Sequence, residues 1–388
     1  NDSRGHCEAN PSHPDYPGRL NSIGLVDMSD IYYAWVNEVV TRVLEVYPDK
    51  WFGLLAYCDV MDPPSFPLHP RVIPFITKDR MAWIDEGTRE AGHKQMAAWN
   101  EVANQVAWYD YMYGGAHYIV PRIFSHIMAE NFCYAKRNRV AGTYTEMYHT
   151  AIDGPKPWLS ARLQWDPEQD VDQLLQEWYE RAVGPAAADD LAAFYDLWEH
   201  FWTERIKESP WFARAKGQTY LPFTDQGYLH FVTDEDISES KRLLASAVAK
   251  AQTSQQEARA RLIQQAFEYC EASVLSYPRQ IEPLEDGSAA LAALARLENT
   301  LKERLHAAQR RYAIVDESSE KRIYDWTGWP VEEFFHLVRY MHECERAGGP
   351  VTEQVRLMAK EDSSRQLRAF AELLLQVRDG SSSLTQAS

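Results

Sequence analysis

Residues 51–57 read WFGLLAY, a short and nearly continuous apolar run. Similar runs follow at residues 72–77 (VIPFIT), 105–111 (QVAWYDY) and 139–146 (RVAGTYTE). Segments of this length and composition are typical of parallel strands that are buried on both faces of a sheet. The first part of the chain is therefore predicted to hold four such strands.

Helical patterns lie before and between these runs. Apolar residues spaced by three and four predict helices over residues 29–47, 93–103 and 122–137. Strands that alternate with helices through short connections form a parallel α/β sheet. A closed (β/α)8 barrel needs eight strands, so we interpret residues 1–165 as the later half of such a TIM barrel. We expect the chain to be a fragment whose earlier strands precede Asn1.

After Asp153 the strand patterns stop and long helical patterns take over. These patterns cover residues 170–183, 187–207, 236–252, 255–273, 288–311, 332–344 and 364–377. The expected fold class is therefore α/β plus all-α, with an all-helical C-terminal domain over residues 166–379. Residues 380–388 are small and polar, and we predict a disordered tail there.

The overall composition narrows the classes of function. The 388 residues carry a formal net charge of −17 without a visible basic patch, so nucleic acid is not an expected partner. No apolar run reaches the length of a membrane-spanning helix, so we expect no membrane span. The 13 Trp and 21 Tyr residues suit a protein that binds sugars on aromatic rings, although such residues also fill ordinary cores. The oligomeric state stays open.

Carboxylates and tyrosines recur at the predicted strand ends. In α/β barrels the reactive groups lie at the carboxyl ends of the strands. Glycoside hydrolysis uses one carboxylic acid to protonate the leaving oxygen, and a second carboxylate or the substrate's own acetamido group to act at the sugar carbon. We therefore predict catalytic roles for Glu146 and Asp2. The predicted substrate-binding residues are Tyr57, Asp59, Tyr109, Asp110, Tyr148 and Trp158.

Each candidate also has a structural interpretation. A carboxylate at a strand end often caps a helix or stays in solvent. Asp110 has an aromatic residue on either side and equally suits an acceptor for a buried tyrosine hydroxyl. For Glu146, the structural alternative is an ion pair with Arg122 or Lys156.

The first loop contains residue types that bind metals, but their spacing fits no zinc pattern. These residues are Asp2, His6, Cys7, Glu8 and His13. We expect neither a metal nor a cofactor. Three functions stay open at this point: a glycoside hydrolase, a non-catalytic glycan-binding barrel, and a metal-dependent hydrolase.

Longer stretches of the sequence resemble a known family. They are VNEVVTRVLEVYPDKWFGLLAY (36–57), WYDYMYG (108–114), VAGTYTE (140–146) and the run from YHTAIDGPKPW to DDLAAFY (148–195). They resemble a bacterial family, domain of unknown function 4838, which is similar to the endo-β-N-acetylglucosaminidases of glycoside hydrolase family 163. The resemblance implies a complete barrel and a glycan that contains acetamido sugars as the substrate. It also implies a secreted or periplasmic protein. The family commonly has several cysteines in the first loop, where this chain has only Cys7.

The negative net charge of the chain also indicates which kind of sugar it binds. Long-range repulsion disfavours polyanionic glycans, so we expect neutral or acetamido sugars rather than acidic ones. The alternative is a carboxylate clamp built from basic residues near the strand ends. These residues are Arg4, Lys78, Arg80, Arg122 and Lys156.

Overall fold

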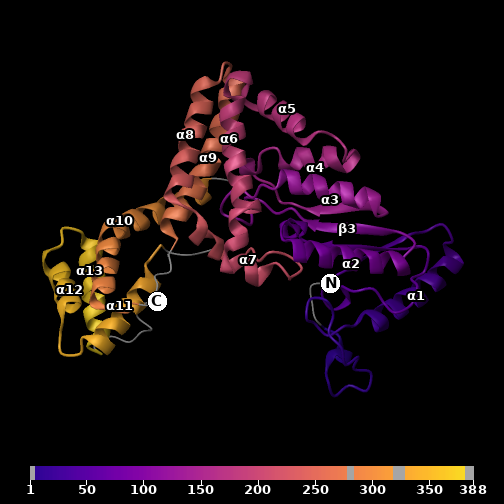
Figure 1. Ribbon diagram of the computed structural model, residues 1–388, viewed down its shortest axis with the longest axis horizontal. Coiled ribbons are helices and arrows are strands. Elements are labelled where there is room, and N and C mark those ends of the chain that lie inside the picture. The colour runs from indigo at the N-terminus through magenta and orange to yellow at the C-terminus, as the bar shows by residue number, and fades with distance from the viewer. Residues whose placement is uncertain (1–4, 278–283, 318–327, 381–388) are drawn as a thin grey trace. The chain divides into compact units, whose positions relative to one another are not determined.

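The computed structural model of the chain describes residues 5–277, 284–317 and 328–380. The chain divides into two compact units, Asn1–Gln264 and Gln265–Ser388, and each has its own core (Figure 1). The predicted domain boundary between residues 165 and 166 stays a prediction. The predicted disordered tail lies, apart from Gly380, outside the described residues.

The first unit contains a four-stranded parallel sheet in the order β1-β2-β3-β4. Its strands are β1 (Phe52–Ala56), β2 (Val72–Lys78), β3 (Val106–Tyr111) and β4 (Val140–Glu146). The prediction of a mixed α/β fold with four parallel strands is therefore confirmed. Pro74 of β2 is paired with Leu54 of β1, so the proline does not interrupt the strand.

Helices cover one face of this sheet. They are α1 (Ser29–Val46), α2 (Glu86–Val102) and α3 (Ser125–Arg137). Trp99 of α2 shares a buried core with Val106 and Trp108 of β3. Successive side chains of a strand point to opposite faces, so Tyr109 and Tyr111 lie on the other face of the sheet. We call this second face, which carries Tyr109, Tyr111 and Glu146, the site face.

Two helices begin three or more residues from their predicted start. Helix α2 begins at Glu86, seven residues before the predicted start at 93, because the side chain of Asp85 caps it by accepting a hydrogen bond from the Thr88 amide. Helix α3 begins at Ser125 rather than at 122, because Arg122 is buried and its guanidinium donates to backbone carbonyls of the preceding loop.

The remainder of the first unit is helical. It contains α4 (Lys156–Trp165), α5 (Val171–Val183), α6 (Pro185–Thr203), η5 (Arg205–Glu208), α7 (Pro210–Ala215), η6 (Gln226–Phe231) and α8 (Asp234–Lys250). Helix α9 (Ser254–Ser276) runs across the boundary between the two units. The sequence prediction missed α4 and α7.

The second unit contains a bundle of helices, which Figure 1 shows in orange and yellow. They are α10 (Gly287–Glu317), α11 (Val331–Cys344), α12 (Pro350–Glu361) and α13 (Arg365–Arg378). Leu294, Leu297 and Leu301 of α10 share its core with Phe334 and Phe370. Helix α12 was not predicted. In the part of the chain that the structure describes, no helix has the length and apolar character needed to cross a membrane.

Candidate active site at the carboxyl edge of the sheet

The carboxyl edge of the sheet carries unusual backbone. Cys58 follows β1 with φ 50° and Tyr148 follows β4 with φ 44°. Non-glycine residues rarely adopt this left-handed conformation, which costs about 1–3 kcal/mol per residue and is concentrated at functional sites. Since parallel strands all end at the same edge, both strained residues lie where an α/β fold builds its site.

Glu146 is the carboxylate of the site face at this edge. Tyr109 donates its hydroxyl hydrogen to Oε2 of Glu146 over 2.6 Å. Tyr113 and Tyr148 also lie near Glu146: burial and then Glu146 raise the pKa of Tyr113, and the charge of Glu146 raises the pKa of Tyr148. Burial raises the pKa of Tyr109, and the hydrogen bond with Glu146 raises it further. Glu146 thus accepts a hydrogen bond from Tyr109 and has two further tyrosines nearby.

Aromatic rings in mutual contact surround Glu146. The Tyr113 and His117 rings are stacked at 4.0 Å between centroids, and Tyr109 and Tyr144 at 4.8 Å. Further contacts join Tyr111 to Tyr220 at 5.1 Å and Tyr113 to Phe223 at 5.3 Å. We call this set the aromatic cluster. Its members are Tyr109, Tyr111, Tyr113, His117, Tyr144, Tyr148, Tyr220 and Phe223.

A ligand can reach part of the cluster from solvent. Tyr144 is 56% exposed and Tyr148 is 61% exposed, whereas Tyr113 is buried. His117 is partly buried, and burial lowers the pKa of its imidazole although the nearby Glu146 opposes this effect. The cluster therefore presents exposed ring faces beside a carboxylate and an imidazole.

Three buried ion pairs support the loops of this edge. Arg122 binds Asp79 through both carboxylate oxygens, at 2.7 and 2.6 Å. Lys156 lies 3.0 Å from Asp153 and donates to the carbonyls of Tyr113 and Arg122. Burial opposes ionisation of Arg122, but the charge of Asp79 raises the pKa of Arg122 overall. These pairs join the loops that follow β2, β3 and β4, and so fix the position of Tyr113.

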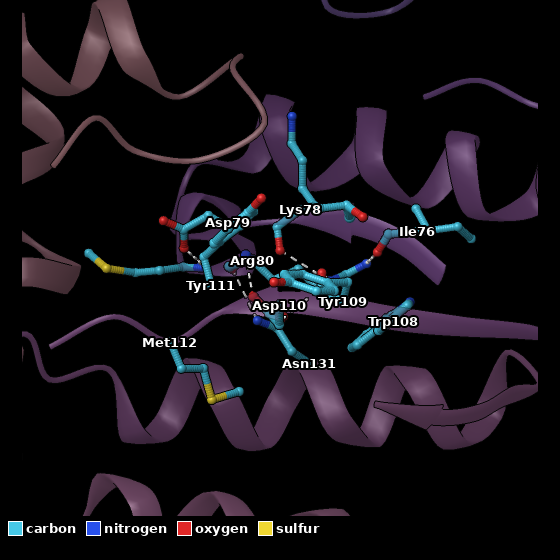
Figure 2. A network of polar contacts seen from close by, with 12 residues as sticks. Ile76, Lys78, Asp79, Arg80, Trp108, Tyr109, Asp110, Tyr111, Met112 and Asn131 are labelled. Carbon is cyan, nitrogen blue, oxygen red and sulfur yellow. Dashed lines mark hydrogen bonds and ion pairs between the residues drawn. The ribbon is translucent and has the colours of Figure 1, made fainter. Parts of the chain in front are cut away.

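The third pair lies on the helix-covered face. Arg80 and Asp110 are 3.4 Å apart, and the guanidinium lies 3.9 Å from the centroid of the Trp108 ring (Figure 2). Burial raises the pKa of Asp110 to about 6, although Arg80 opposes this. Asp110 therefore points away from Tyr109, its neighbour in sequence, and the structure does not bring it together with Glu146.

The structure unites some predicted residues and separates others. Tyr109 and Tyr148 lie beside Glu146 as described, and Tyr57 lies close to Tyr111 of the aromatic cluster. Asp59 is buried in η2 (Cys58–Val60), away from these contacts.

Trp158 is half-buried in α4, with the guanidinium of Arg162 5.2 Å from its ring centroid. Asp2 lies outside the described residues. The substrate-binding roles of Asp59, Asp110 and Trp158 and the catalytic role of Asp2 stay predictions.

The basic residues of the possible clamp are occupied by the protein itself. Arg80, Arg122 and Lys156 form the buried ion pairs. Lys78 donates to the carbonyls of Gly217 and Gln218 at 3.3 and 2.6 Å, and burial lowers its pKa to about 8. Arg4 lies outside the described residues. Across residues 5–277, 284–317 and 328–380, no three His, Cys, Asp or Glu side chains are grouped so that they could hold a metal ion.

Sequence reasoning missed three members of the site. His117 belongs to the loop after β3, and the preceding Gly114-Gly115 was the only signal for a tight loop there. A Cβ atom on Gly114 would lie 1.5 Å from Oδ1 of Asp153, so this position must be glycine. Tyr220 and Phe223 follow the strands by more than 70 residues, and no local pattern marks them.

Comparison with known proteins identifies the family of the chain. Residues 1–196 match the family described as Domain of unknown function (DUF4838), which is half of the 388-residue chain. The chain therefore belongs to this family, as its sequence motifs predicted. The match includes all four strands and Glu146, and ends before Tyr220. No curated protein and no solved structure matches the chain.

Proposed function

We propose that this protein is a glycoside hydrolase that acts on glycans containing acetamido sugars, with Glu146 as a reacting carboxylate. One observation carries the proposal: Glu146 ends a parallel strand, accepts the Tyr109 hydroxyl at 2.6 Å and is surrounded by aromatic rings. Barrel enzymes build their sites at this edge. The proposal includes the barrel itself, of which the four strands are one half, and kinship with glycoside hydrolase family 163.

The chemistry would be hydrolysis of a glycosidic bond. The bond between the sugar carbon and the leaving oxygen breaks, the leaving oxygen takes a proton, and water supplies the new hydroxyl of the sugar. The hydrogen bond from Tyr109 holds Glu146 as an acceptor. This suits a carboxylate that stabilises positive charge on the sugar or orients its acetamido group. Asp2 is the proposed second carboxylate of the reaction. In a substrate-assisted reaction, the acetamido oxygen of the sugar acts as the nucleophile instead.

The surroundings of Glu146 support a neutral sugar. Lys78, Arg122 and Lys156 are engaged by carbonyls and carboxylates of the protein, so none of them is available to bind a uronate. Exposed rings such as Tyr144 and Tyr148 can pack on the apolar C–H face of a sugar without any charge. A secreted or periplasmic location in a bacterium belongs to the same proposal.

The substitution Glu146→Gln tests this function because it keeps the shape and removes the charge. We expect turnover of an N-glycan or a chitin oligomer to fall by about 10²–10³-fold, the range typical of a lost electrostatic stabiliser. The melting temperature should stay nearly unchanged, because Gln can still accept from Tyr109. Glu90→Gln, on the exposed side of α2, is the matched control. Full activity of the Glu146 variant would refute the catalytic role.

A second function, glycan binding without catalysis, is favoured by one observation. Three other carboxylates near the strand ends, Asp79, Asp110 and Asp153, are each paired with a buried cation. Glu146 therefore has no partner among these three for a two-carboxylate reaction. A binding protein would retain its glycan affinity in the Glu146→Gln variant and would show no turnover in the wild type.

A further inference from the structure

A segment that is far from the strands in sequence lies against the carboxyl edge of the sheet. We call residues 217–223 (GQTYLPF) the strap. The amide of Asp79 donates to the Thr219 carbonyl over 2.8 Å, and the amide of Leu221 donates to the Asp79 carboxylate over 3.2 Å. The hydroxyl of Tyr118 donates to the Leu221 carbonyl over 2.7 Å. The loops after β2 and β3 therefore both hold the strap.

The start of the strap is fixed as well. Lys78, the last residue of β2, donates to the carbonyls of Gly217 and Gln218. Just before the strap, Lys216 lies 2.7 Å from Asp85. Leu221 is buried, which anchors the centre of the strap. Backbone groups make most of these contacts, so the side chains of Tyr220 and Phe223 are not needed to hold the strap in place.

Tyr220 and Phe223 present a pair of rings next to Glu146. The two rings are stacked with centroids 5.4 Å apart and an angle of 20°. Phe223 meets the rings of Tyr113 and His117 almost perpendicularly, at 89° and 86°. Tyr113 and His117 both lie near Glu146, so one aromatic ring separates Phe223 from that carboxylate. Both strap rings are partly exposed.

We infer that Tyr220 and Phe223 form a binding platform for a second sugar ring, so that the strap selects oligosaccharides over single sugars. Two stacked and partly exposed aromatic rings offer the apolar surface on which the C–H face of a sugar packs. The neighbouring cation, Lys78, is bound to strap carbonyls, so the platform suits a neutral sugar. The inference rests on the proposed function for the place of the first sugar.

Calorimetric titration tests the platform without turnover when all proteins carry Glu146→Gln, which removes the proposed reacting carboxylate. The probes are N-acetylglucosamine and its neutral β-linked tetrasaccharide. In Tyr220→Ala and Phe223→Ala we expect about tenfold weaker binding of the tetrasaccharide and less than about twofold change for the monosaccharide, as for a lost aromatic contact. Phe335→Ala, which removes a partly exposed ring from the second unit, is the control and should leave both affinities unchanged.

Two conservative variants guard against misfolding. Tyr220→Phe keeps the ring and should retain the tetrasaccharide affinity. Phe223→Leu keeps apolar volume without a ring and should lose affinity with an unchanged melting temperature. Unchanged tetrasaccharide affinity in both alanine variants would overturn the platform, and so would an equal loss for the monosaccharide.

The outcome for the platform can be separated from the outcome for the proposed function. Full turnover in Glu146→Gln would refute the catalytic role, while a selective loss of tetrasaccharide affinity in the strap variants would still support the platform. A wild-type protein that binds neither probe would overturn both.

Discussion

At the scale of single residues, Gly114 shows how tightly the loop after β3 is packed. The Gly115 amide donates to Oδ1 of Asp153 over 3.1 Å, and Asp153 in turn binds Lys156. A Cβ atom on Gly114 would overlap Oδ1 of Asp153, and the carboxylate has no room to retreat because it is fully buried. Any side chain at position 114 therefore displaces one partner of a buried ion pair.

We expect Gly114→Ala to destabilise the protein by about 3–5 kcal/mol, the range for a broken buried ion pair. Chemical denaturation followed by circular dichroism measures the loss. Gly142→Ala is the matched control, since a Cβ atom there meets nothing within 4 Å, and it should change the stability little. Equal stabilities of the two variants would contradict this account of the loop.

The residue scale also shows what the sequence could reveal about the site. Glu146, Tyr109 and Tyr148 were predicted because each stands at the end of an apolar run. Asp110 stands there too, but strand alternation turns its side chain to the other face, where Arg80 pairs with it. His117 could not be predicted, since its place depends on a loop shape that only the buried ion pairs define.

At the scale of elements, the strands were predicted well and some helices poorly. Each strand is a short apolar or aromatic run bounded by turns, so its sequence shows it directly. The prediction that the strands are buried on both faces was wrong for β4, which has no buried residue. The helices that escaped prediction, α4, α7 and α12, each have proline in the first two positions. Proline suits the start of a helix because no backbone donor is needed there, but within a sequence it is easily taken as a break.

His126 links three helices of the first unit. From α3, its Nδ1 lies 3.1 Å from a carboxylate oxygen of Glu199 in α6, and its Nε2 lies 3.1 Å from Asp172 in α5. The hydrogen bond with Glu199 raises the pKa of His126 to about 9, although burial opposes it. The imidazole is therefore charged at neutral pH and bridges two carboxylates.

A raised pKa gives stability that is complete below the unfolded value of about 6.5 and is lost as the pH rises through about 9. The His126 side chain is 52% exposed, so solvent screening limits the effect to about 1 kcal/mol, or roughly 2–4 °C in Tm. We expect the wild-type protein to be more stable than His126→Gln by this amount at pH 6. At pH 10 the two proteins should be equally stable. A difference that stays constant across this range in differential scanning calorimetry would disprove the bridge.

At the scale of the whole molecule, the net charge of −17 sets the field that a charged ligand meets. The Debye length is about 30 Å at 0.01 M salt and about 8 Å at 0.15 M, so this field acts mainly at low salt. Among the described residues near the site, Lys78, Arg122 and Lys156 are occupied internally and are not available to offset the repulsion of an acidic glycan.

We therefore expect the affinity for a uronate-bearing oligosaccharide to be low at 0.01 M salt and to increase toward 0.15 M, where screening weakens the repulsion. A neutral oligosaccharide of the same length should bind with the same affinity at both salt concentrations. Calorimetry or fluorescence titration gives both affinities. Stronger binding of the acidic ligand at the lower salt concentration would reveal a cationic clamp and contradict a neutral substrate.

The division into units shows where sequence reasoning stops at this scale. The change from strands to helices near residue 165 is plain in the sequence, whereas the contacts divide the chain at Gln264 and Gln265. Hydrogen bonds such as that from Trp202 of α6 to the Pro121 carbonyl hold later helices against the loops of the sheet. A pattern of secondary structure does not contain such contacts, so the extent of a compact unit cannot be derived from it.

The three buried ion pairs also constrain how this protein can evolve. Arg122 lies in the loop after β3 and Asp79 in the loop after β2, while Lys156 follows β4 and reaches the carbonyl of Arg122. A chimera that received only the loop after β2 or only the loop after β3 from a relative would inherit half of the Arg122–Asp79 pair and could bury an uncompensated charge. We therefore expect stable chimeras only when these loops are exchanged together. The loops are inherited as one unit although they are separate in sequence.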